Sequence, residues 1–313
     1  MAALQTLRSI NSSLETTQAR VSSGMRVEQA SDNAAYWSIA TTMRSDNRAL
    51  STVEDALGLG AAKVDTAYAA MESAIEVVGE MKAKLVAAYG VGADRGKIQE
   101  EIAQLQQQLK SIAESASFSG ENWIQAKISD GTSEIPTTKD VVASFVRNAS
   151  GQVSVKTVAY PLDSKTVLFD LDDSGGDKFG ILDSEAALED GTLLGFSVST
   201  LDITDLDDVK WAIGPDTTDE QALEAMTQFL DQQLGAMTSA ASTLGSMQSR
   251  INMQEDFVAN LMDVIDKGVG RLVDADMNEE STRLKALQTQ QQLGIQSLSI
   301  ANTSAENILQ LFK

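Results

Sequence analysis

The sequence predicts a mainly α-helical chain, in which a long antiparallel helical rod has coiled-coil termini and a small β-rich outer domain is inserted in the middle. Three observations predict this class. Both flanks, 1–135 and 216–313, lack proline, so long helices can run through them. Apolar residues in the flanks recur with a heptad period. The middle contains Val-, Phe- and Thr-rich runs separated by Gly-containing turn signals, a pattern typical of short strands.

The N-terminal flank predicts two helices of the rod. One heptad position is apolar from Leu50 onward, and its partner position holds small residues such as Gly60, which let neighbouring backbones approach closely. A turn at Tyr89–Gly96 then precedes a second apolar seam from Ile98 to Ile112. The residues expected in the core of the rod from this flank are Leu57, Val64, Met71, Val78 and Leu85.

The C-terminal flank continues the same heptad pattern from Leu223 to Leu272. A helix of that length would extend about 75 Å, more than a compact domain spans. An amphipathic helix of an ordinary bundle would account for any single seam, but three seams around one insertion favour the rod. The expected core residues here are Leu244, Ile251 and Val258.

The middle segment predicts short antiparallel strands at 141–146, 153–158, 166–171 and 193–201. Within it, Asp170–Asp177 partly resembles a calcium-binding loop. The twelfth position is Ile181, so the bidentate glutamate of such a loop is missing, and we interpret the segment as a turn between strands.

Both termini are poor in charge but rich in apolar residues. Residues 286–313 contain only Glu306 and Lys313 as charged side chains, and residues 1–19 contain only Arg8 and Glu15. Disordered tails are usually charged and poor in Leu and Ile, so we expect ends that become buried on assembly. Different contacts on two sides of a subunit can propagate as a helical polymer. The expected assembly residues are Leu7, Leu14, Val21, Leu284, Leu287, Ile295, Leu298 and Leu309.

Composition argues against catalysis and against several partners. The chain has no His and no Cys, and its 24 basic and 45 acidic residues give a net charge of −21. Such an acidic chain is repelled by nucleic acid and by anionic membranes. Paired carboxylates such as Asp172–Asp173 lack an apolar pocket signal around them. We therefore expect a protein that is not an enzyme and uses no cofactor or metal. The N-terminus lacks the apolar run of a secretory signal, so export would need another route.

Motifs at both ends resemble those of bacterial flagellins. Residues 18–40 are similar to the family's N-terminal signature, and 271–276 to an element near its C-terminal end. The stretch 118–124 and the last seventeen residues are similar to two further motifs, in the same order. The resemblance covers both flanks and not the middle. The signature residues singled out are Ser22, Ser23, Gly24, Arg26, Asp32, Arg271, Asp274 and Asp276.

This resemblance implies a subunit of the extracellular flagellar filament, used for swimming. Residues 1–34 and 276–313 would form an inner coiled coil, 35–125 and 214–275 a rod domain, and 126–213 an exposed outer domain. The implied partners are further copies of the chain and other flagellins, flagellar cap and junction proteins, an export chaperone and the flagellar export apparatus. The family pattern has a short lead-in before Met1, so we expect a shortened N-terminal partner helix.

Family members display two segments that host immune receptors recognise. In the first, Ser31, Asn33 and Tyr36 replace the usual Lys, Asp and Gly. In the second, Glu80 replaces an Arg and Ala83 replaces a Glu. Because reversed charge weakens recognition of a charged patch, we expect poor recognition by plant and animal flagellin receptors.

Three alternatives remain open at this point. A hook–filament junction protein would share both terminal signatures and differ in abundance. A cytoplasmic coiled-coil scaffold would need neither uncharged termini nor export. A secreted adhesin would carry its binding site in 126–213.

Overall fold

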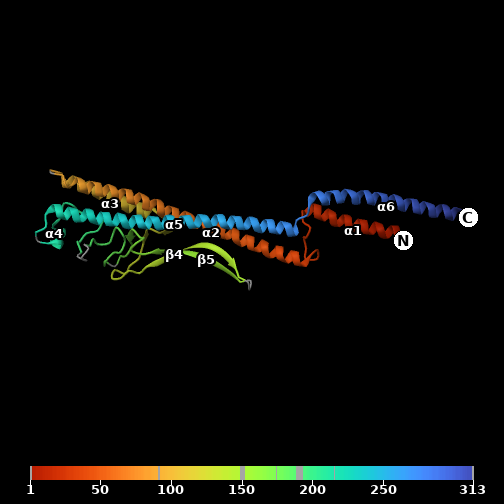
Figure 1. Cartoon of the computed structure of the whole chain (residues 1–313), viewed down its shortest axis with the longest axis horizontal. Helices are drawn as coiled ribbons and strands as arrows, with labels where there is room; N and C mark the ends of the chain where they lie inside the picture. The colour runs from red at the N-terminus through yellow and green to blue at the C-terminus, as the bar shows by residue number, and fades with distance from the viewer. Residues whose placement is uncertain are drawn as a thin grey trace. The chain divides into compact units, whose positions relative to one another are not determined.

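Most of the chain is helical in the computed structural model, which describes residues 2–90, 92–148, 152–173, 175–187, 193–214 and 216–311 (Figure 1). The residues form two compact units. Unit 1 combines Met1–Ser51 with Asn260–Lys313, and unit 2 is Thr52–Ala259. The predicted class, mainly helical with a small β region in the middle, is confirmed.

Unit 1 is built from two antiparallel helix pairs. α1 (Ala2–Ser23) lies beside α6 (Met277–Leu311), where Nε2 of Gln291 donates to Oδ1 of Asn11 at 2.8 Å (Figure 1). The first part of α2 (Ala34–Ala87) lies along the last part of α5 (Asp219–Val273), where Nδ2 of Asn47 donates to Oδ1 of Asp266 at 2.6 Å. Helices from the two ends of the chain therefore pair with each other, although most of the sequence lies between them.

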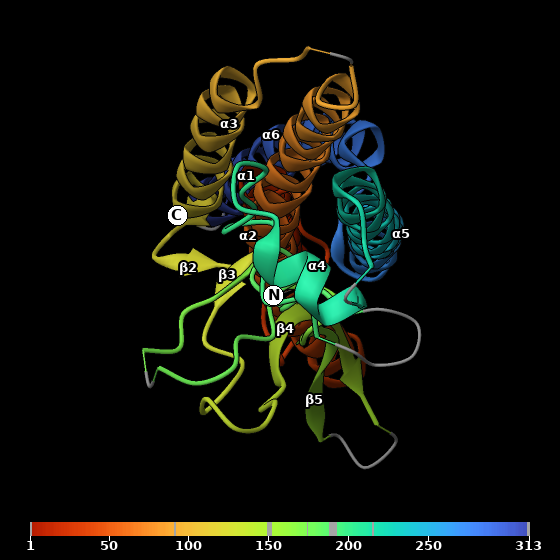
Figure 2. The same ribbon diagram turned by 90° about the vertical axis from the view of Figure 1, so that its left-hand side faces the viewer.

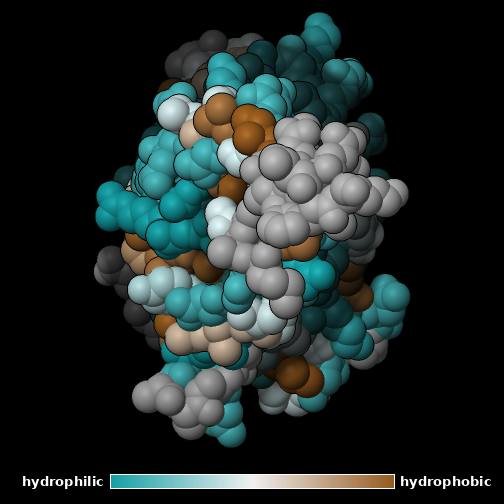
Figure 3. Space-filling model, turned by 90° about the vertical axis from the view of Figure 1, so that its right-hand side faces the viewer, coloured by the Kyte–Doolittle hydropathy of each residue, from teal (hydrophilic) through white to brown (hydrophobic). Residues whose placement is uncertain are grey.

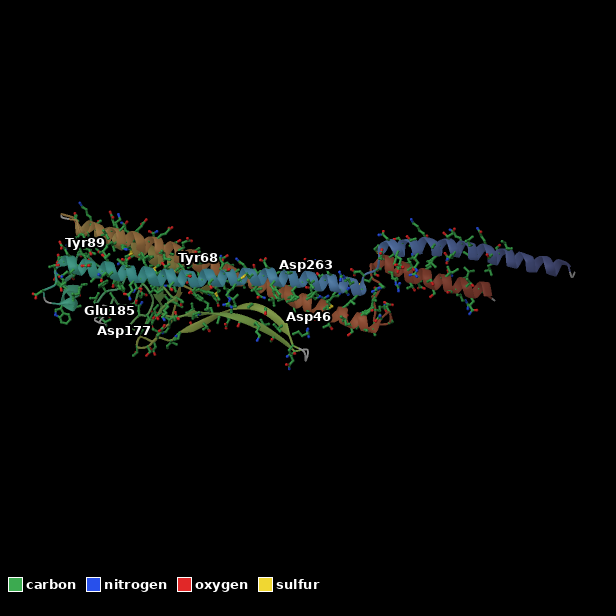
Figure 4. All side chains as sticks on the ribbon, in the orientation of Figure 1. Asp46, Tyr68, Tyr89, Asp177, Glu185 and Asp263 are labelled. Carbon is green, nitrogen blue, oxygen red and sulfur yellow. The ribbon has the colours of Figure 1, made fainter. Side chains whose placement is uncertain are left out.

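In unit 2, α2 and α5 pair in one constant antiparallel register. Tyr68 faces Gly245, Asp65 bonds Gln248, and Lys82 pairs with Asp231, so the residue numbers in each pair add to 313 (Figure 4). The predicted rod core lies in this pairing, and each of its residues is at most 2% exposed: Leu57, Val64, Met71, Val78, Leu85, Leu244, Ile251 and Val258. Heptad spacing places these residues on one face of each helix.

α3 (Arg95–Ser115) is a further long helix of unit 2 (Figure 2). The predicted turn separates it from α2, and the Asp94 side chain caps its first turn by accepting from the Lys97 amide. Its buried face consists of Ile102, Leu109 and Ala113. Next to this face, Oε2 of Glu101 lies 2.5 Å from Nζ of Lys84 of α2.

In the described residues of the β region, the strands form three two-stranded sheets. β1 (Ser117–Phe118) and β2 (Glu121–Asn122) form a hairpin whose turn has positive φ at Ser119 and Gly120. β4 (Thr137–Arg147) pairs antiparallel with β5 (Val153–Leu162) and has a bulge after Val142. β3 (Gln125–Ala126) pairs with β6 (Phe169–Asp170), and this pair is parallel.

Two of the four predicted strands are wrong in detail. The third is only the two residues of β6 and is parallel, not antiparallel. The fourth, 193–201, is not a strand: after one bridge at Leu193, the Ser197 amide donates to Oγ1 of Thr200 and closes a turn. Local Ser and Thr side chains there compete with a ladder for the backbone groups. A short helix, α4 (Asp207–Ile213), follows and was not predicted.

The segment that resembles a calcium loop uses its first carboxylate for the backbone. Asp170 is buried and accepts from the amides of Ile128, Asp172 and Phe179. Ser174, a further position of that loop, lies outside the described residues. Among the described helices, none is both long enough and apolar enough to cross a membrane.

Candidate assembly surfaces

The two terminal motifs meet in unit 1 and form one joint, which we define as residues 24–27 together with 273–276. Gly24 ends α1 with φ 70°, a left-handed conformation that glycine adopts without strain, and its amide donates to the Arg20 carbonyl. The Arg26 amide donates to the Val273 carbonyl at 2.6 Å, and the Ala275 amide donates to the Gly24 carbonyl at 2.9 Å. Backbone pairing thus ties the exit of α1 to the link between α5 and α6.

Side chains of the motifs complete the joint by capping helices. Nη2 of Arg26 donates to the Leu272 carbonyl at 3.1 Å, at the C-terminal end of α5, where a cation is favoured. Oδ1 of Asp276 accepts from two amides in the first turn of α6. Asp32 accepts from the Gln29 and Glu28 amides, and these bonds lower the pKa of its carboxyl.

The remaining signature positions are placed around this joint. Oγ of Ser23 accepts a hydrogen bond from the Met25 amide. The backbone of Asp274 forms an isolated antiparallel β-bridge with that of Met25. Ser22 and Arg271 are exposed. An apolar cluster closes beneath them. Its buried members are Val27, Ala40, Val269 and Val273, and Met25, Met43, Ile265 and Leu272 pack against these.

One ion pair links α1 to α6 beside the joint. Nη1 of Arg20 lies 3.1 Å from Oε1 of Glu280, whose side chain is only 7% exposed. Sequence reasoning missed this pair because charged residues on a helix normally face water. Its only signal was position, since Arg20 lies within the N-terminal signature and Glu280 lies one turn after the C-terminal element.

The predicted assembly residues lie along the α1–α6 pair but are incompletely covered there. Leu7, Leu14, Val21, Leu284, Leu287 and Leu298 are half-buried, and Ile295 is 56% exposed. Leu309 belongs to α6, but its side chain lies outside the described residues. Within its described residues, the pair exposes four further large apolar side chains that were not singled out: Leu4, Met277, Leu293 and Ile300. Figure 3 shows such brown, apolar residues on a surface that is otherwise mostly hydrophilic.

The altered receptor segments lie on exposed surface in each unit. In unit 1, Ser31 and Tyr36 are exposed, and Oδ1 of Asn33 caps α2 by accepting from the Tyr36 amide. In unit 2, Glu80 and Ala83 are exposed on α2. The substituted side chains are therefore accessible in the single chain.

Paired terminal helices with apolar residues left on their outer faces define a structural subunit of a self-assembling filament. Residues 1–129 match the model of the bacterial flagellin N-terminal helical region, and residues 227–312 match that of the bacterial flagellin C-terminal helical region. The chain belongs to the bacterial flagellin family.

Named relatives match the whole chain. Flagellin C of Rhizobium meliloti (strain 1021) is 58% identical over 100% of this chain and 97% of its own length. Flagellin A of the same strain is 51% identical (100% and 98%), and a flagellin of Brucella melitensis is 42% identical (100% and 96%). A solved Vibrio parahaemolyticus structure, described as a flagellar hook-associated protein, covers 78% of this chain and 100% of its own at 12% identity, with a TM-score of 0.44.

Family membership defines the biological role. The protein is a structural, non-enzymatic subunit that polymerises with copies of itself in the extracellular flagellar filament, which serves motility.

Proposed function

We propose that the α1–α6 pair of unit 1 is the surface through which subunits join. The observation that carries this proposal is the combination of exposed apolar residues with scarce charge on the same two helices. Exposure of such an apolar face to water is unfavourable, and a neighbouring copy can cover it. The half-buried seam residues, from Leu7 to Leu298, then become core residues of the polymer.

The three-part division predicted from the sequence follows from this role. Residues 1–34 and 276–313 form the inner part of the filament, 35–125 and 214–275 surround it, and 126–213 face the medium. Contacts of this kind differ on the two sides of each copy, so they can propagate from copy to copy as a helix. The resulting tube transmits the torque of the motor.

The same surface accounts for the further flagellar partners expected from the sequence. The cap and junction proteins meet the exposed ends of the α1–α6 layer at the two ends of the filament. An export chaperone covers the charge-poor C-terminal segment before assembly, and the export apparatus carries the unfolded chain. A Cys-free chain suits that route because it cannot form disulfides during transit.

Truncation and substitution test the assembly surface. A chain lacking residues 286–313, and the variant Ile295→Gln with Ile300→Gln, should fail to polymerise from purified monomers or require at least about tenfold more protein. Val155→Gln, at an equally exposed apolar residue of β5, is the matched control. Filaments that form equally well from all four chains would contradict the proposal.

We also propose that the altered segments weaken recognition by flagellin receptors. Glu80 places a negative charge where the family pattern has a positive one, and it is exposed. The purified monomer should activate plant and animal flagellin receptors poorly. Restoring the family residues, with Glu80→Arg and Ala83→Glu, should raise activation, and strong activation by the unaltered monomer at nanomolar dose would refute the idea.

A further inference from the structure

Trp211 on α4 is the most exposed large apolar side chain in the described part of the chain, at 86%. The other two tryptophans differ from it. Trp123 is buried and stacks on Tyr160 with ring centroids 5.4 Å apart, and Trp37 is 39% exposed. An indole so fully in water is unfavourable for a free subunit, and exposed tryptophans are enriched where a partner binds.

α4 holds the backbone of Trp211 in place. Leu206 and Val209 bury the opposite face of the helix in unit 2. Beside Trp211, Nζ of Lys210 lies 2.9 Å from Oδ1 of Asp219, at the start of α5, and Nη1 of Arg95 lies 2.7 Å from the other oxygen of Asp219. Figure 2 shows α4 facing the viewer in front of α2 and α5. Little backbone freedom of α4 remains to be lost on binding, which favours an anchor.

Charge limits what can bind there. Unit 2 contains 34 of the 45 acidic residues and 14 of the 24 basic ones, a net charge of −20, whereas unit 1 has 11 and 10, a net charge of −1. Around α4, exposed acidic side chains include Asp205, Asp207, Asp208 and Asp216. A second unit 2, a nucleic acid or an anionic membrane would be repelled. Unit 1 of another copy would not.

Unit 1 has an exposed apolar patch that suits an indole. Tyr36 and Ile39 lie on one side of the first turns of α2, three residues apart, and Trp37 lies between them in sequence. All three are between 39% and 49% exposed. Tyr36 and Trp37 are the exposed aromatic side chains of unit 1 within its described residues. Aromatic anchors of an interface tend to pair with one another.

We propose that Trp211 of one subunit is buried against the Tyr36–Ile39 patch of a second copy of this chain. The contact is head to tail, from unit 2 of one copy to unit 1 of the next, so it repeats without closing. This inference rests on the proposed function only because it requires that subunits assemble. The residues that it uses lie outside the α1–α6 surface.

The first test measures the critical concentration for polymerisation of purified monomers. Trp211→Ala should raise it at least about tenfold, as expected for an interface anchor. The monomer's circular dichroism and melting temperature should not change, because the indole touches little of its own subunit. Val86→Ala, at an exposed apolar residue of α2, is the control and should leave the critical concentration unchanged.

The second test uses the absence of cysteine from the chain. Subunits with Trp211→Cys and subunits with Trp37→Cys are mixed, polymerised and oxidised. Disulfide-linked dimers should form from the mixture and not from either variant alone, nor when Val155→Cys replaces the second partner.

The outcomes separate two kinds of failure. Filaments that form with an unchanged critical concentration for Trp211→Ala, or that give no disulfide-linked dimer in the mixture, would overturn this inference and leave the α1–α6 proposal intact. Monomers that polymerise equally well with and without residues 286–313, as long as Trp211 is present, would overturn the α1–α6 proposal instead.

Discussion

Unit 1 and unit 2 differ in how completely they bury their heptad residues. In unit 2 the heptad residues are completely buried, and nearly all of the net charge of the chain lies on the outside. In unit 1 the heptad residues of α1 and α6 are half-buried, and acidic and basic residues almost balance. The comparison indicates that the heptad core of unit 2 is complete within one chain, whereas α1 and α6 of unit 1 leave apolar residues that we propose other chains cover.

The largest expected effect that tests this comparison comes from the same change, leucine to alanine, made in each unit. Leu85→Ala, in the core of unit 2, should lower the free energy of unfolding of the monomer by about 3 kcal/mol in a urea titration, because it leaves a cavity. Leu284→Ala, at a half-buried position of α6, should change the same quantity by about 1 kcal/mol or less. Its larger effect should appear in the stability of filaments. Equal effects on the monomer would contradict the difference between the units.

The buried ion pair of unit 1 should give the next largest effect. Arg20→Ala leaves the Glu280 carboxylate buried without its cation, which costs about 3 kcal/mol for such pairs, less for a half-exposed arginine. We expect a lower melting temperature of the filament by calorimetry. Replacing both residues with leucine should recover most of the loss. Glu279→Gln, at the exposed neighbouring position, serves as the control, and a fall as large as that of Arg20→Ala would argue against a specific pair.

Two glycines of α2 should respond in opposite directions. A Cβ at Gly60 would lie 2.2 Å from Cγ1 of Val141, so Gly60→Ala should destabilise unit 2 by about 1–2 kcal/mol. At Gly79 a Cβ would meet nothing within 4 Å, so Gly79→Ala should stabilise it by about 1 kcal/mol through helix propensity. Thermal melts of the monomer measure both. The double variant with Val141→Ala should repair Gly60→Ala, and failure to do so would place the strain elsewhere.

The smallest effect concerns the Glu121 carboxylate of unit 2. Its oxygens lie 2.8 Å from Nζ of Lys63 and 3.3 Å from Nζ of Lys139, and the hydrogen bond from Lys63 is the main cause that lowers the pKa of Glu121 to about 2. A lowered folded-state pKa contributes stability above the ordinary pKa of 4.5, and this is lost as the pH falls from there towards 2.

The matching variant is Glu121→Gln. It should unfold more easily than the parent by about 1 kcal/mol or less at pH 7, because the pair is partly exposed. The difference should shrink in urea titrations between pH 5 and pH 3. A difference that grows as the pH falls would exclude this origin.

Periodicity explains how much of the fold the sequence revealed. A heptad repeat is a local property of a helix, so the seam through Leu57, Met71 and Leu85 could be assigned without knowing its partner. The partner itself was less predictable. Gly60 was expected to let helices approach, whereas the residue that it admits is Val141 of β4.

Other features were missed because they depend on contacts far apart in sequence. The family motifs pointed to Arg26 and Asp276, but only the fold reveals that they cap α5 and α6 at one joint. α4 is seven residues long, too short to establish a helical period. The turn through Ser197 was mistaken for a strand because its apolar residues outweighed the hydroxyls that close it.

The joint also determines when this subunit can become native. Its hydrogen bonds connect Gly24 with Ala275 and Arg26 with Val273. In a chain that emerges N-terminus first, Gly24 and Arg26 therefore remain without these partners for almost the entire time of delivery. Contacts of such sequence separation form slowly, after local structure. A chain interrupted before Val273 can form none of them. The joint therefore closes only after the chain has been delivered as far as Ala275.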